Sequence, residues 1–219
     1  GFSPAEIARV EKGELVFGTI RPSSERELVA AFAFLVPTAP GDLVAQARQG
    51  LLDRVDPNTL AFALLPDPPS LAGFAKLTLE PGSPKQAQSY VGAKPGGGLN
   101  LSSQEIAAFH ALGSGAAVPA VEQAVREALL ARLEAYRAKG LAGVAPYALA
   151  GGAERSPADE LRSATGAAKM LQKYVPAAYQ MLLDYPGSRA PGTQEAFRWA
   201  RFLANGAPAI SLTHTLQVP

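Results

Sequence analysis

A long stripe of apolar residues at helical spacing constrains the fold of this chain more than any other feature. Its five side chains lie three or four residues apart: Val121, Val125, Leu129, Leu133 and Tyr136. Pro119 suits the first turn of a helix, and Gly140 is the type of residue that ends one. The pattern therefore predicts an amphipathic helix over 119–139, about 31 Å long, which is enough to cross a small domain.

Pairs of opposite charge fall on other faces of this predicted helix. Glu122 and Arg126 are four residues apart, and Glu134 and Arg137 are three apart. Such pairs stabilise a helix by about 0.2–0.5 kcal/mol each. They support the helix prediction without indicating any chemistry.

Capping residues, turn residues and β-branched segments predict the other elements. Ser3 with Glu6 and Ser102 with Glu105 have the spacing of capping boxes at the start of two helices. Helices are expected over 4–12, 41–49, 84–91 (with Ser83 as its cap), 103–112, 157–163, 166–174, 176–184 and 193–205. Strands are expected over 14–20, 28–36, 59–64, 77–79 and 208–218, with a further extended segment over 99–101.

The segments 14–20 and 28–36 are separated by a polar turn at 21–26 and predict an antiparallel pair. Apolar side chains occupy both faces of 28–36, so we expect that strand to be central or covered on both sides. Its nine apolar residues are far short of the roughly 20 needed to span a bilayer, and no transmembrane segment is predicted.

The chain as a whole is predicted to be a single α+β domain over 1–219. An antiparallel sheet would pack against the long helix, with a mainly helical C-terminal half and a possible helical sub-region over 118–205. At 219 residues such a domain buries about 70% of its unfolded surface. With 20 basic and 19 acidic residues and no basic stripe, nucleic acid is not an expected partner.

The two ends of the chain leave questions open. Position 1 is Gly rather than Met, which fits a processed mature end or a tag remnant, so a periplasmic or secreted location after signal removal stays open. Residues 202–219 contain no charged side chain. A strand over 208–218 should therefore be paired inside a sheet or against a protein partner, and the chain either ends there or continues with further strands.

Candidates for catalysis are few, because the chain has no cysteine and only two histidines. His110 and His214 belong to no metal or protease motif, and we interpret both as packed or surface residues. Ser114 follows a predicted helix, unlike the serine of a hydrolase elbow. The glycines at 96–98 lack the lysine of a phosphate-binding loop. No catalytic residue, metal ligand or cofactor is predicted.

Aromatic residues concentrate in the last third of the chain and line cores or apolar pockets equally well. This group comprises Tyr174, Tyr179, Tyr185, Phe197, Trp199 and Phe202. We consider them together with the predicted strand 28–36, which is apolar on both faces, and with the long helix. These elements lead to four candidate ligand-binding residues: Phe32, Phe34, Tyr136 and Trp199.

Three short patterns carry a family resemblance: Leu77-Thr78-Leu79-Glu80-Pro81-Gly82, the spacing of Tyr136-Arg137 to Gly140 and Tyr147, and Ile210-Ser211-Leu212-Thr213-His214. They resemble an uncharacterised family of bacterial proteins that are often predicted to be exported. Members of that family continue with further strands and a last helix. The chain is also similar to the START-like helix-grip architecture, which implies a curved sheet around a long helix and an apolar cavity.

Two functions follow as hypotheses. The first is a non-catalytic binding protein whose cavity takes a lipid-like or other hydrophobic small molecule. The alternative is a structural or interaction subunit of a larger assembly, suggested by the uncharged segment 208–218 and by a charged fraction of only 18%. An enzyme is less expected, because no acid–base set can be assembled from the sequence.

Overall fold

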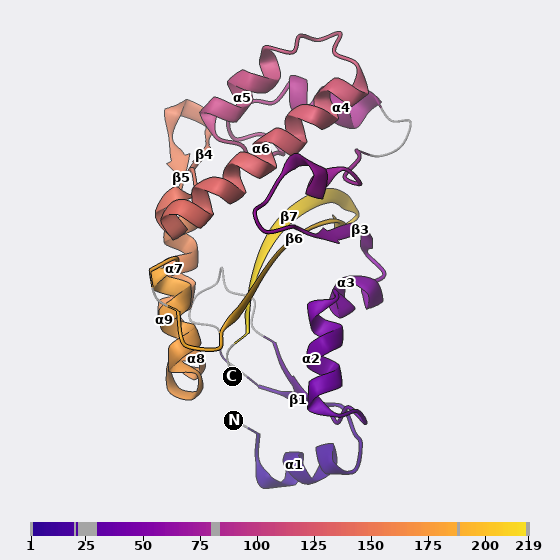
Figure 1. Cartoon of the computed structure of the whole chain (residues 1–219), viewed down its shortest axis with the longest axis vertical. Coiled ribbons are helices and arrows are strands. Elements are labelled where there is room, and N and C mark those ends of the chain that lie inside the picture. Colours follow the sequence, from indigo (N-terminus) through magenta and orange to yellow (C-terminus); the bar gives the residue numbers. More distant parts are fainter. Residues whose placement is uncertain (1, 20, 22–29, 80–83, 188, 218–219) are drawn as a thin grey trace. The chain divides into compact units, whose positions relative to one another are not determined.

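A computed structural model describes residues 2–19, 21, 30–79, 84–187 and 189–217 (Figure 1). The chain divides into two compact units, residues 1–48 and residues 49–219. Each unit has its own helices and its own antiparallel sheet. The α+β class, the antiparallel sheet and the long helix predicted from the sequence are confirmed.

The first unit contains α1 (Pro4–Glu11), β1 (Val16–Gly18), β2 (Ala31–Ala33) and α2 (Pro40–Arg48). Ser3 and Glu6 form the predicted capping box, in which each side chain hydrogen-bonds to the backbone N–H of the other. Strands β1 and β2 pair antiparallel, as expected, with Phe17 opposite Phe32. Both strands are shorter than predicted, and most of the predicted turn at 21–26 lies outside the described residues.

The expectation that segment 28–36 is central or covered on both sides is wrong. Among the described residues of this segment, 30–36, only Ala31–Ala33 is a strand, and it belongs to a two-stranded sheet. Phe17, Phe32 and Phe34 are 72%, 56% and 52% exposed. Apolar composition on both faces indicates a buried strand only if other elements are available to cover it, and the described part of this unit supplies just one pairing strand.

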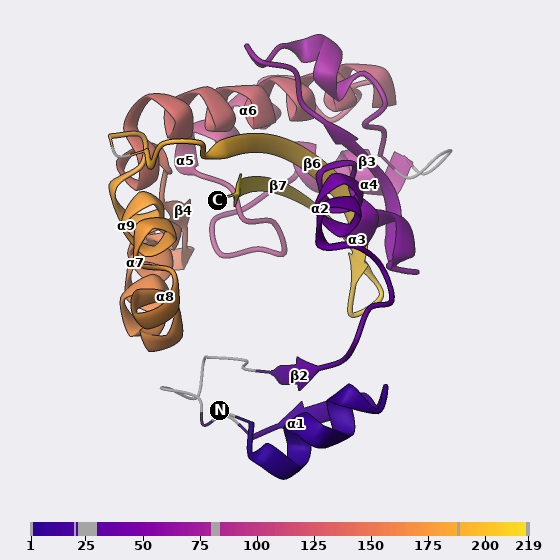
Figure 2. The same ribbon diagram turned by 60° about the horizontal axis from the view of Figure 1, so that its bottom comes forward.

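The sheet of the second unit has the order β3-β6-β7, with both pairs antiparallel. Strand β3 spans Thr59–Leu64 as predicted, β6 spans Gln194–Ala204 and β7 spans Ala207–Gln217. Asn205 and Gly206 have φ angles of 51° and 77°, the left-handed conformation that a two-residue hairpin turn requires. Figure 2 shows the resulting β6–β7 hairpin as a long curved ribbon beside the long helix.

The prediction of a helix over 193–205 is therefore wrong. Phe197, Trp199 and Arg201 lie on one face of β6, and Arg198 and Ala200 lie on the other, which is the two-residue period of a strand. Every residue of β6 is paired with one of β7. The Asn-Gly turn fixes that register. Pairing with both neighbouring strands outweighs the helix preference of the alanines and arginines, which misled the helix assignment.

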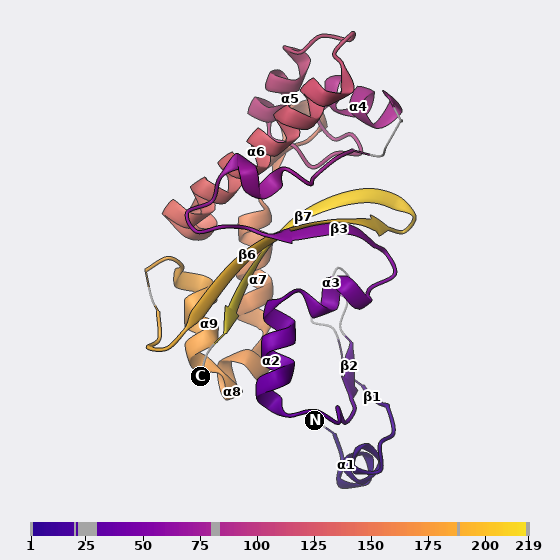
Figure 3. The same cartoon turned by 45° about the vertical axis from the view of Figure 1, so that its right-hand side comes forward.

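The long helix α6 (Val118–Lys139) lies against the sheet and carries the core of the second unit (Figure 3). Its predicted stripe is confirmed, since Val121, Val125, Leu129 and Leu133 are buried. Trp199 from β6 packs into the same core with no exposed surface. Helices α4 (Pro84–Val91) and α5 (Ser103–His110) add further core residues, and Ser102 with Glu105 forms the predicted capping box of α5.

Residues 77–79 form no strand, contrary to the prediction, although Leu77 and Leu79 are completely buried. Their backbone groups are satisfied from α6 instead. Glu122 Oε1 accepts the Leu79 N–H at 2.8 Å, and Arg126 Nε donates to the Leu77 carbonyl at 2.9 Å. The predicted Glu122–Arg126 pair is confirmed at 3.5 Å, and its members also hold this buried segment.

The remaining elements of the second unit are short. Helices α3 (Leu51–Val55), α7 (Pro157–Ala167), α8 (Lys169–Tyr174) and α9 (Pro176–Asp184) are accompanied by strands β4 (Tyr147–Ala148) and β5 (Glu154–Arg155) and by 3₁₀ turns η1 (Leu71–Phe74), η2 (Gly140–Gly143) and η3 (Ala150–Gly152). The predicted helices in 157–184 are thus confirmed, with α7 longer than expected. The cap predicted at Ser83 lies outside the described residues.

Two smaller expectations concern 99–101 and Arg137. Residues 99–101, expected to be extended, lie outside any helix or strand, and the Leu101 carbonyl accepts a hydrogen bond from the Ala148 N–H at 2.9 Å. Arg137 pairs with Asp67 at 2.6 Å, and the described residues show no Glu134–Arg137 pair. Among the described helices, none combines the length and the apolar character needed to cross a membrane.

Candidate functional site

Two neighbouring cavities lie along α6 in the second unit. The larger has a volume of about 800 Å³ and the smaller about 500 Å³. Five residues line both of them: Ala128, Leu129, Arg132, Tyr147 and Ile210. The cavities share a wall formed by the middle of α6, one residue of β7 and one of β4.

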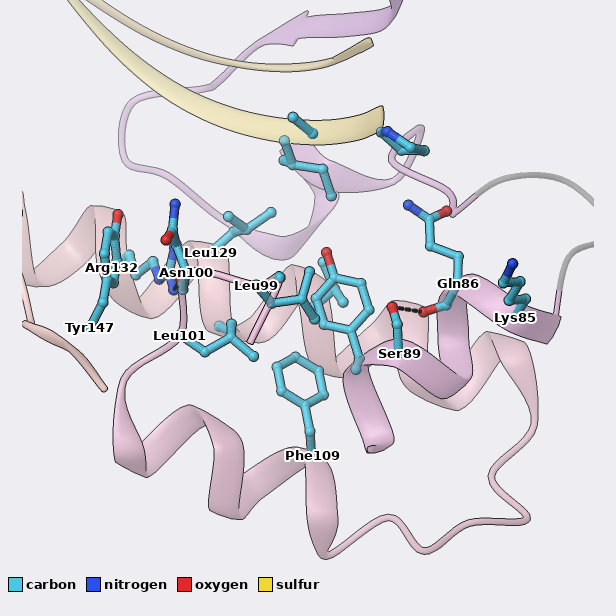
Figure 4. A pocket seen from close by; sticks show the side chains of 17 residues that line it. Lys85, Gln86, Ser89, Leu99, Asn100, Leu101, Phe109, Leu129, Arg132 and Tyr147 are labelled. Atoms are coloured by element: carbon cyan, nitrogen blue, oxygen red, sulfur yellow. Dashed lines mark hydrogen bonds between the residues drawn. The ribbon is translucent and has the colours of Figure 1, made fainter. Parts of the chain in front are cut away.

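The smaller cavity has an apolar middle and polar ends (Figure 4). The middle is lined by Leu99, Leu101, Phe109 and Leu129. In Figure 4, Asn100, Arg132 and Tyr147 lie at one end, and Lys85, Gln86 and Ser89 lie at the other. At that second end the Ser89 hydroxyl donates to the Gln86 carbonyl at 2.6 Å, so this hydroxyl is already engaged.

The shared wall is organised by an ion pair between Arg132 and Glu105. Arg132 Nε and Nη2 donate to the two carboxylate oxygens of Glu105 at 2.5 and 2.7 Å. Burial alone would raise the pKa of Glu105. The hydrogen bonds and the positive charge of Arg132, together with the hydrogen bonds of Ser102, outweigh the effect of burial, so the pKa of Glu105 is lowered. Burial likewise acts to lower the pKa of Arg132, and Glu105 outweighs it so that this pKa is raised.

The Tyr147 ring packs against this ion pair and against a second arginine. Its ring lies 5.8 Å from the guanidinium of Arg132 and 5.4 Å from that of Arg155. The charge of Arg132 is thus balanced by Glu105 and its surface is partly covered by an aromatic ring. Nε and Nη2 of this arginine are engaged by Glu105 and by the Asn100 carbonyl.

The larger cavity has a hydrogen-bonded chain at its other end. The Tyr136 hydroxyl lies 2.9 Å from His214 Nδ1, and His214 Nε2 lies 3.0 Å from Glu195 Oε2. Arg189 Nη2 donates to Glu195 Oε1 at 2.6 Å. The side chains of His214 and Glu195 are both only 10% exposed. This hydrogen-bonded chain joins side chains of α6, β6, β7 and the loop that precedes β6. Its members Tyr136 and His214 are 78 positions apart in the sequence.

The chemistry of these groups fixes the direction of the hydrogen bonds. A carboxylate held by Arg189 can only accept, so His214 Nε2 carries the imidazole proton and donates it to Glu195. Burial lowers the pKa of His214 against the opposing effect of Glu195, which favours the neutral ring. Nδ1 of a neutral ring with Nε2 protonated is an acceptor, so the Tyr136 hydroxyl donates to it.

Tyr136 itself stays protonated at neutral pH. Burial, followed by the nearby Tyr185 and Glu195, raises its pKa to about 12. A phenolate nucleophile is therefore unfavourable at this position. The hydrogen-bonded chain thus provides a fixed, uncharged phenol at the wall of the larger cavity.

Aromatic rings surround the imidazole and hold it in place. The Phe197 ring stacks on His214 with centroids 4.5 Å apart and planes 15° apart. Tyr185 lies 4.6 Å from His214 and stacks on Tyr136 at 4.9 Å. Burial, and then Glu195, raises the pKa of Tyr185, so this phenol is uncharged as well.

The four predicted ligand-binding residues take different positions. Tyr136 lines the larger cavity. Trp199 is a core residue that lines neither cavity, and its Nε1 donates to the Gly73 carbonyl at 2.9 Å. Phe32 and Phe34 belong to the first unit, where their rings lie 6.0 Å apart. A role of these two phenylalanines in ligand binding stays a prediction.

The histidines and Ser114 were interpreted from the sequence as non-catalytic. His110 Nε2 lies 2.7 Å from the Ala93 carbonyl and donates to it, and the residue is exposed. His214 is packed, and it also lines the larger cavity as part of the hydrogen-bonded chain. The backbone carbonyl of Ser114 accepts a hydrogen bond from Gln88, and this serine lines neither cavity.

Glu195 and Tyr185 were missed as site residues, although the sequence contained a signal for Glu195. The Asn-Gly turn sets the hairpin register, which pairs Phe197 with His214 and Glu195 with Leu216. Glu195 and His214 are thus diagonal neighbours on one face of the hairpin. No local pattern connects Tyr185 to this face.

No group of three or more His, Asp or Glu side chains in the described residues is placed to hold a metal ion. Comparison of the chain with protein-family models, with curated proteins and with solved structures found no match. The family and START-like resemblances therefore rest on the sequence patterns alone, and the argument for function rests on the cavities.

Proposed function

We propose that residues 49–219 form a binding module for a hydrophobic small molecule, held in the larger cavity beside α6. The observation that carries the proposal is the cavity itself. Its volume of about 800 Å³ falls within the roughly 300–1,000 Å³ of small-molecule sites. Its lining combines aliphatic side chains with a few polar groups at defined positions, which is the usual composition of such sites.

Aliphatic residues from several elements form the apolar part of this lining. They are Leu129 and Leu133 from α6, Leu141 from η2, Leu161 from α7, Leu182 from α9, and Ile210 and Leu212 from β7. Each contact with an apolar ligand would remove hydrocarbon surface from water, a gain of about 25 cal/mol per Å². This supports a ligand with a substantial hydrocarbon part.

The polar groups support binding over catalysis. Tyr136 is an uncharged phenol whose pKa is raised to about 12, and the charge of Arg132 is balanced by Glu105. A nucleophile is activated by a lowered pKa or by an adjacent base. His214 accepts a hydrogen bond from the Tyr136 hydroxyl, as such a base would, but the raised pKa of this phenol opposes its ionisation.

The first test is native mass spectrometry of the purified protein before and after denaturation. Extra mass that is lost on denaturation would support a co-purifying ligand. The second test is a titration with the uncharged apolar dye N-phenyl-1-naphthylamine, followed by fluorescence. We expect saturable binding to one site.

The matched variants Ala128→Trp and Ala138→Trp locate that site. Ala128 lines both cavities, whereas Ala138 lies on the exposed side of the same helix and lines neither. We expect Ala128→Trp to weaken dye binding at least tenfold and Ala138→Trp to change it less than twofold. Ala131→Trp provides a second cavity variant at an exposed position that also lines the larger cavity. Equal dye binding by all four proteins would contradict the proposal.

The alternative function, a subunit that interacts through segment 208–218, is favoured by one observation. Strand β7 is at the edge of the sheet, and within the described residues only β6 pairs with it. Residues 207–217 carry no Asp, Glu, Lys or Arg. An uncharged edge lacks the usual protection against pairing with another strand.

We propose a second copy of this chain as the partner in that case. Light scattering coupled to size-exclusion chromatography would then give a mass above that of the monomer, and Thr215→Lys on the exposed part of β7 would restore the monomer. A monomer mass for the wild type at every concentration would contradict this alternative.

A further inference from the structure

We propose that Tyr136 makes the larger cavity selective for an uncharged ligand that carries a hydrogen-bond donor, such as a long-chain alcohol or amide. In this arrangement the phenolic oxygen accepts a hydrogen bond from the ligand's O–H or N–H. The corresponding carboxylate anion is disfavoured. This inference rests on the proposed function, because it assumes that the cavity binds a hydrophobic molecule.

The first step of the argument is that the Tyr136 proton is already committed. Glu195 can only accept, so His214 Nε2 must donate to it across 3.0 Å, and His214 Nδ1 must then accept from Tyr136 across 2.9 Å. Arg189 anchors the chain by its 2.6 Å hydrogen bond to Glu195. The first two hydrogen bonds point the same way, from Tyr136 to His214 to Glu195, and Arg189 donates to Glu195 from the far end.

The second step is that the Tyr136 oxygen keeps accepting capacity. A phenol has one proton to donate and can also accept a hydrogen bond. Within the described residues its hydroxyl has His214 as its only hydrogen-bond partner. A ligand donor in the cavity would fill the open position, whereas a ligand acceptor would face the same lone pairs and be repelled.

The third step is that the arginines at the cavity are already in ion pairs. The two arginines that line the larger cavity are each paired, Arg132 with Glu105 and Arg198 with Asp53 at 3.3 Å. Glu195, at the end of the hydrogen-bonded chain, is 10% exposed and is itself paired with Arg189. A carboxylate near Tyr136 would thus meet no uncommitted donor in that chain.

The test compares three ligands with the same hydrocarbon chain, measured by displacement of N-phenyl-1-naphthylamine at pH 8. Dodecan-1-ol carries a donor, dodecyl methyl ether carries only an acceptor, and dodecanoate is an anion at this pH. We expect the alcohol to bind at least fivefold more tightly than the ether and at least tenfold more tightly than dodecanoate.

Two variants assign the preference to a single oxygen. Tyr136→Phe removes the acceptor, so the alcohol and the ether should bind within twofold of each other while the ether keeps its wild-type affinity. Tyr174→Phe is the matched control, because Tyr174 is exposed and lines neither cavity. Its alcohol preference should equal that of the wild type.

The outcomes separate this inference from the proposed function. Dye binding with equal displacement by all three ligands, or with dodecanoate as the best, would overturn the donor-selective site and leave the apolar binding site standing. An alcohol preference that survives in Tyr136→Phe would overturn the role of Tyr136. Absence of dye binding and of displacement by every ligand would overturn both. The comparison among wild-type ligands decides the question even if Tyr136→Phe folds poorly.

Discussion

Glu105 occupies a position where one side chain supports both the fold and the wall of the cavities. Its carboxylate accepts the backbone N–H of Ser102 at 2.8 Å, which completes the capping box of α5. The same carboxylate takes two hydrogen bonds from Arg132 of α6. Glu105→Ala removes all of these interactions in one step and leaves the guanidinium of Arg132 without its counterion.

The expected loss of stability follows from these contacts. Removing capping hydrogen bonds costs about 1 kcal/mol. Breaking a fully buried ion pair from one side costs about 3–5 kcal/mol. Arg132 is 30% exposed and Glu105 is 15% exposed, so water can partly replace the lost partner. The loss of this ion pair is therefore expected to cost about 2 kcal/mol of stability. The total of about 3 kcal/mol corresponds to a fall in Tm of about 6–12 °C.

Urea unfolding can be followed by the fluorescence of Trp199, the only tryptophan, which is fully buried in the core. Glu127→Ala is the matched control, since Glu127 is exposed and, among the residues that the structure describes, its carboxylate accepts only from Gln123. The control should change the free energy of unfolding by less than about 0.5 kcal/mol. If Glu105→Ala lost no more stability than this control, the ion pair and the capping box would not stabilise the fold as argued.

The pH dependence gives a second check on the same residue. The pKa of Glu105 is lowered in the folded protein, so its stabilising effect is complete above the unfolded pKa of about 4.3. It is lost as the pH falls through the lower folded pKa. The difference in stability between wild type and Glu105→Ala should therefore be full at pH 7 and should shrink below about pH 4. A difference that stayed constant into strong acid would point to packing rather than to the charge of Glu105.

Three further predictions concern other contacts. Arg126→Ala leaves the buried carbonyl of Leu77 without its donor and should lower the free energy of unfolding by about 1–3 kcal/mol in urea titrations. Gly140→Ala places a Cβ against the carbonyl of Tyr185 at a φ of 58°, so it should cost more than about 2 kcal/mol and lower Tm in a calorimeter. The pKa of His214 is lowered by burial, so its NMR titration midpoint should lie below 6.5, and the stability it contributes should be present above pH 6.5 and lost as the pH falls through that midpoint.

The long helix could be predicted from the sequence because its signal is local and redundant. The stripe from Val121 to Leu133, the proline at its start and Gly140 at its end all agree, and the observed helix differs from the prediction by one residue. The capping boxes at Ser3 and Ser102 were identified for the same reason. Each of these features is contained within a few turns of chain, where local chemistry decides the conformation.

The β6–β7 hairpin shows where local reasoning failed. Half of it was assigned as a helix over 193–205, although the Asn205-Gly206 pair is the strongest short-range hairpin signal a sequence offers. The wrong helix assignment also hid Glu195 as a site residue, because Glu195 lies diagonal to His214 only when both residues are in paired strands. Contacts between residues such as Tyr136 and His214, which are 78 positions apart, depend on tertiary packing that no local pattern contains.

The same faces of α6, β6 and β7 change from core to cavity along their length. On α6, Val125 is buried in the core, while Tyr136 three turns later lines the cavity. On the hairpin, the pair Trp199–Leu212 packs in or against the core, and the neighbouring pair on that face, Phe197–His214, lines the cavity. Leu129 and Leu212 belong to both regions, because each packs in or against the core and also lines the larger cavity. Arg126 lines neither cavity, so its variant tests the fold alone, whereas Tyr136 variants test selectivity and Glu105, in the cavity wall, contributes to both.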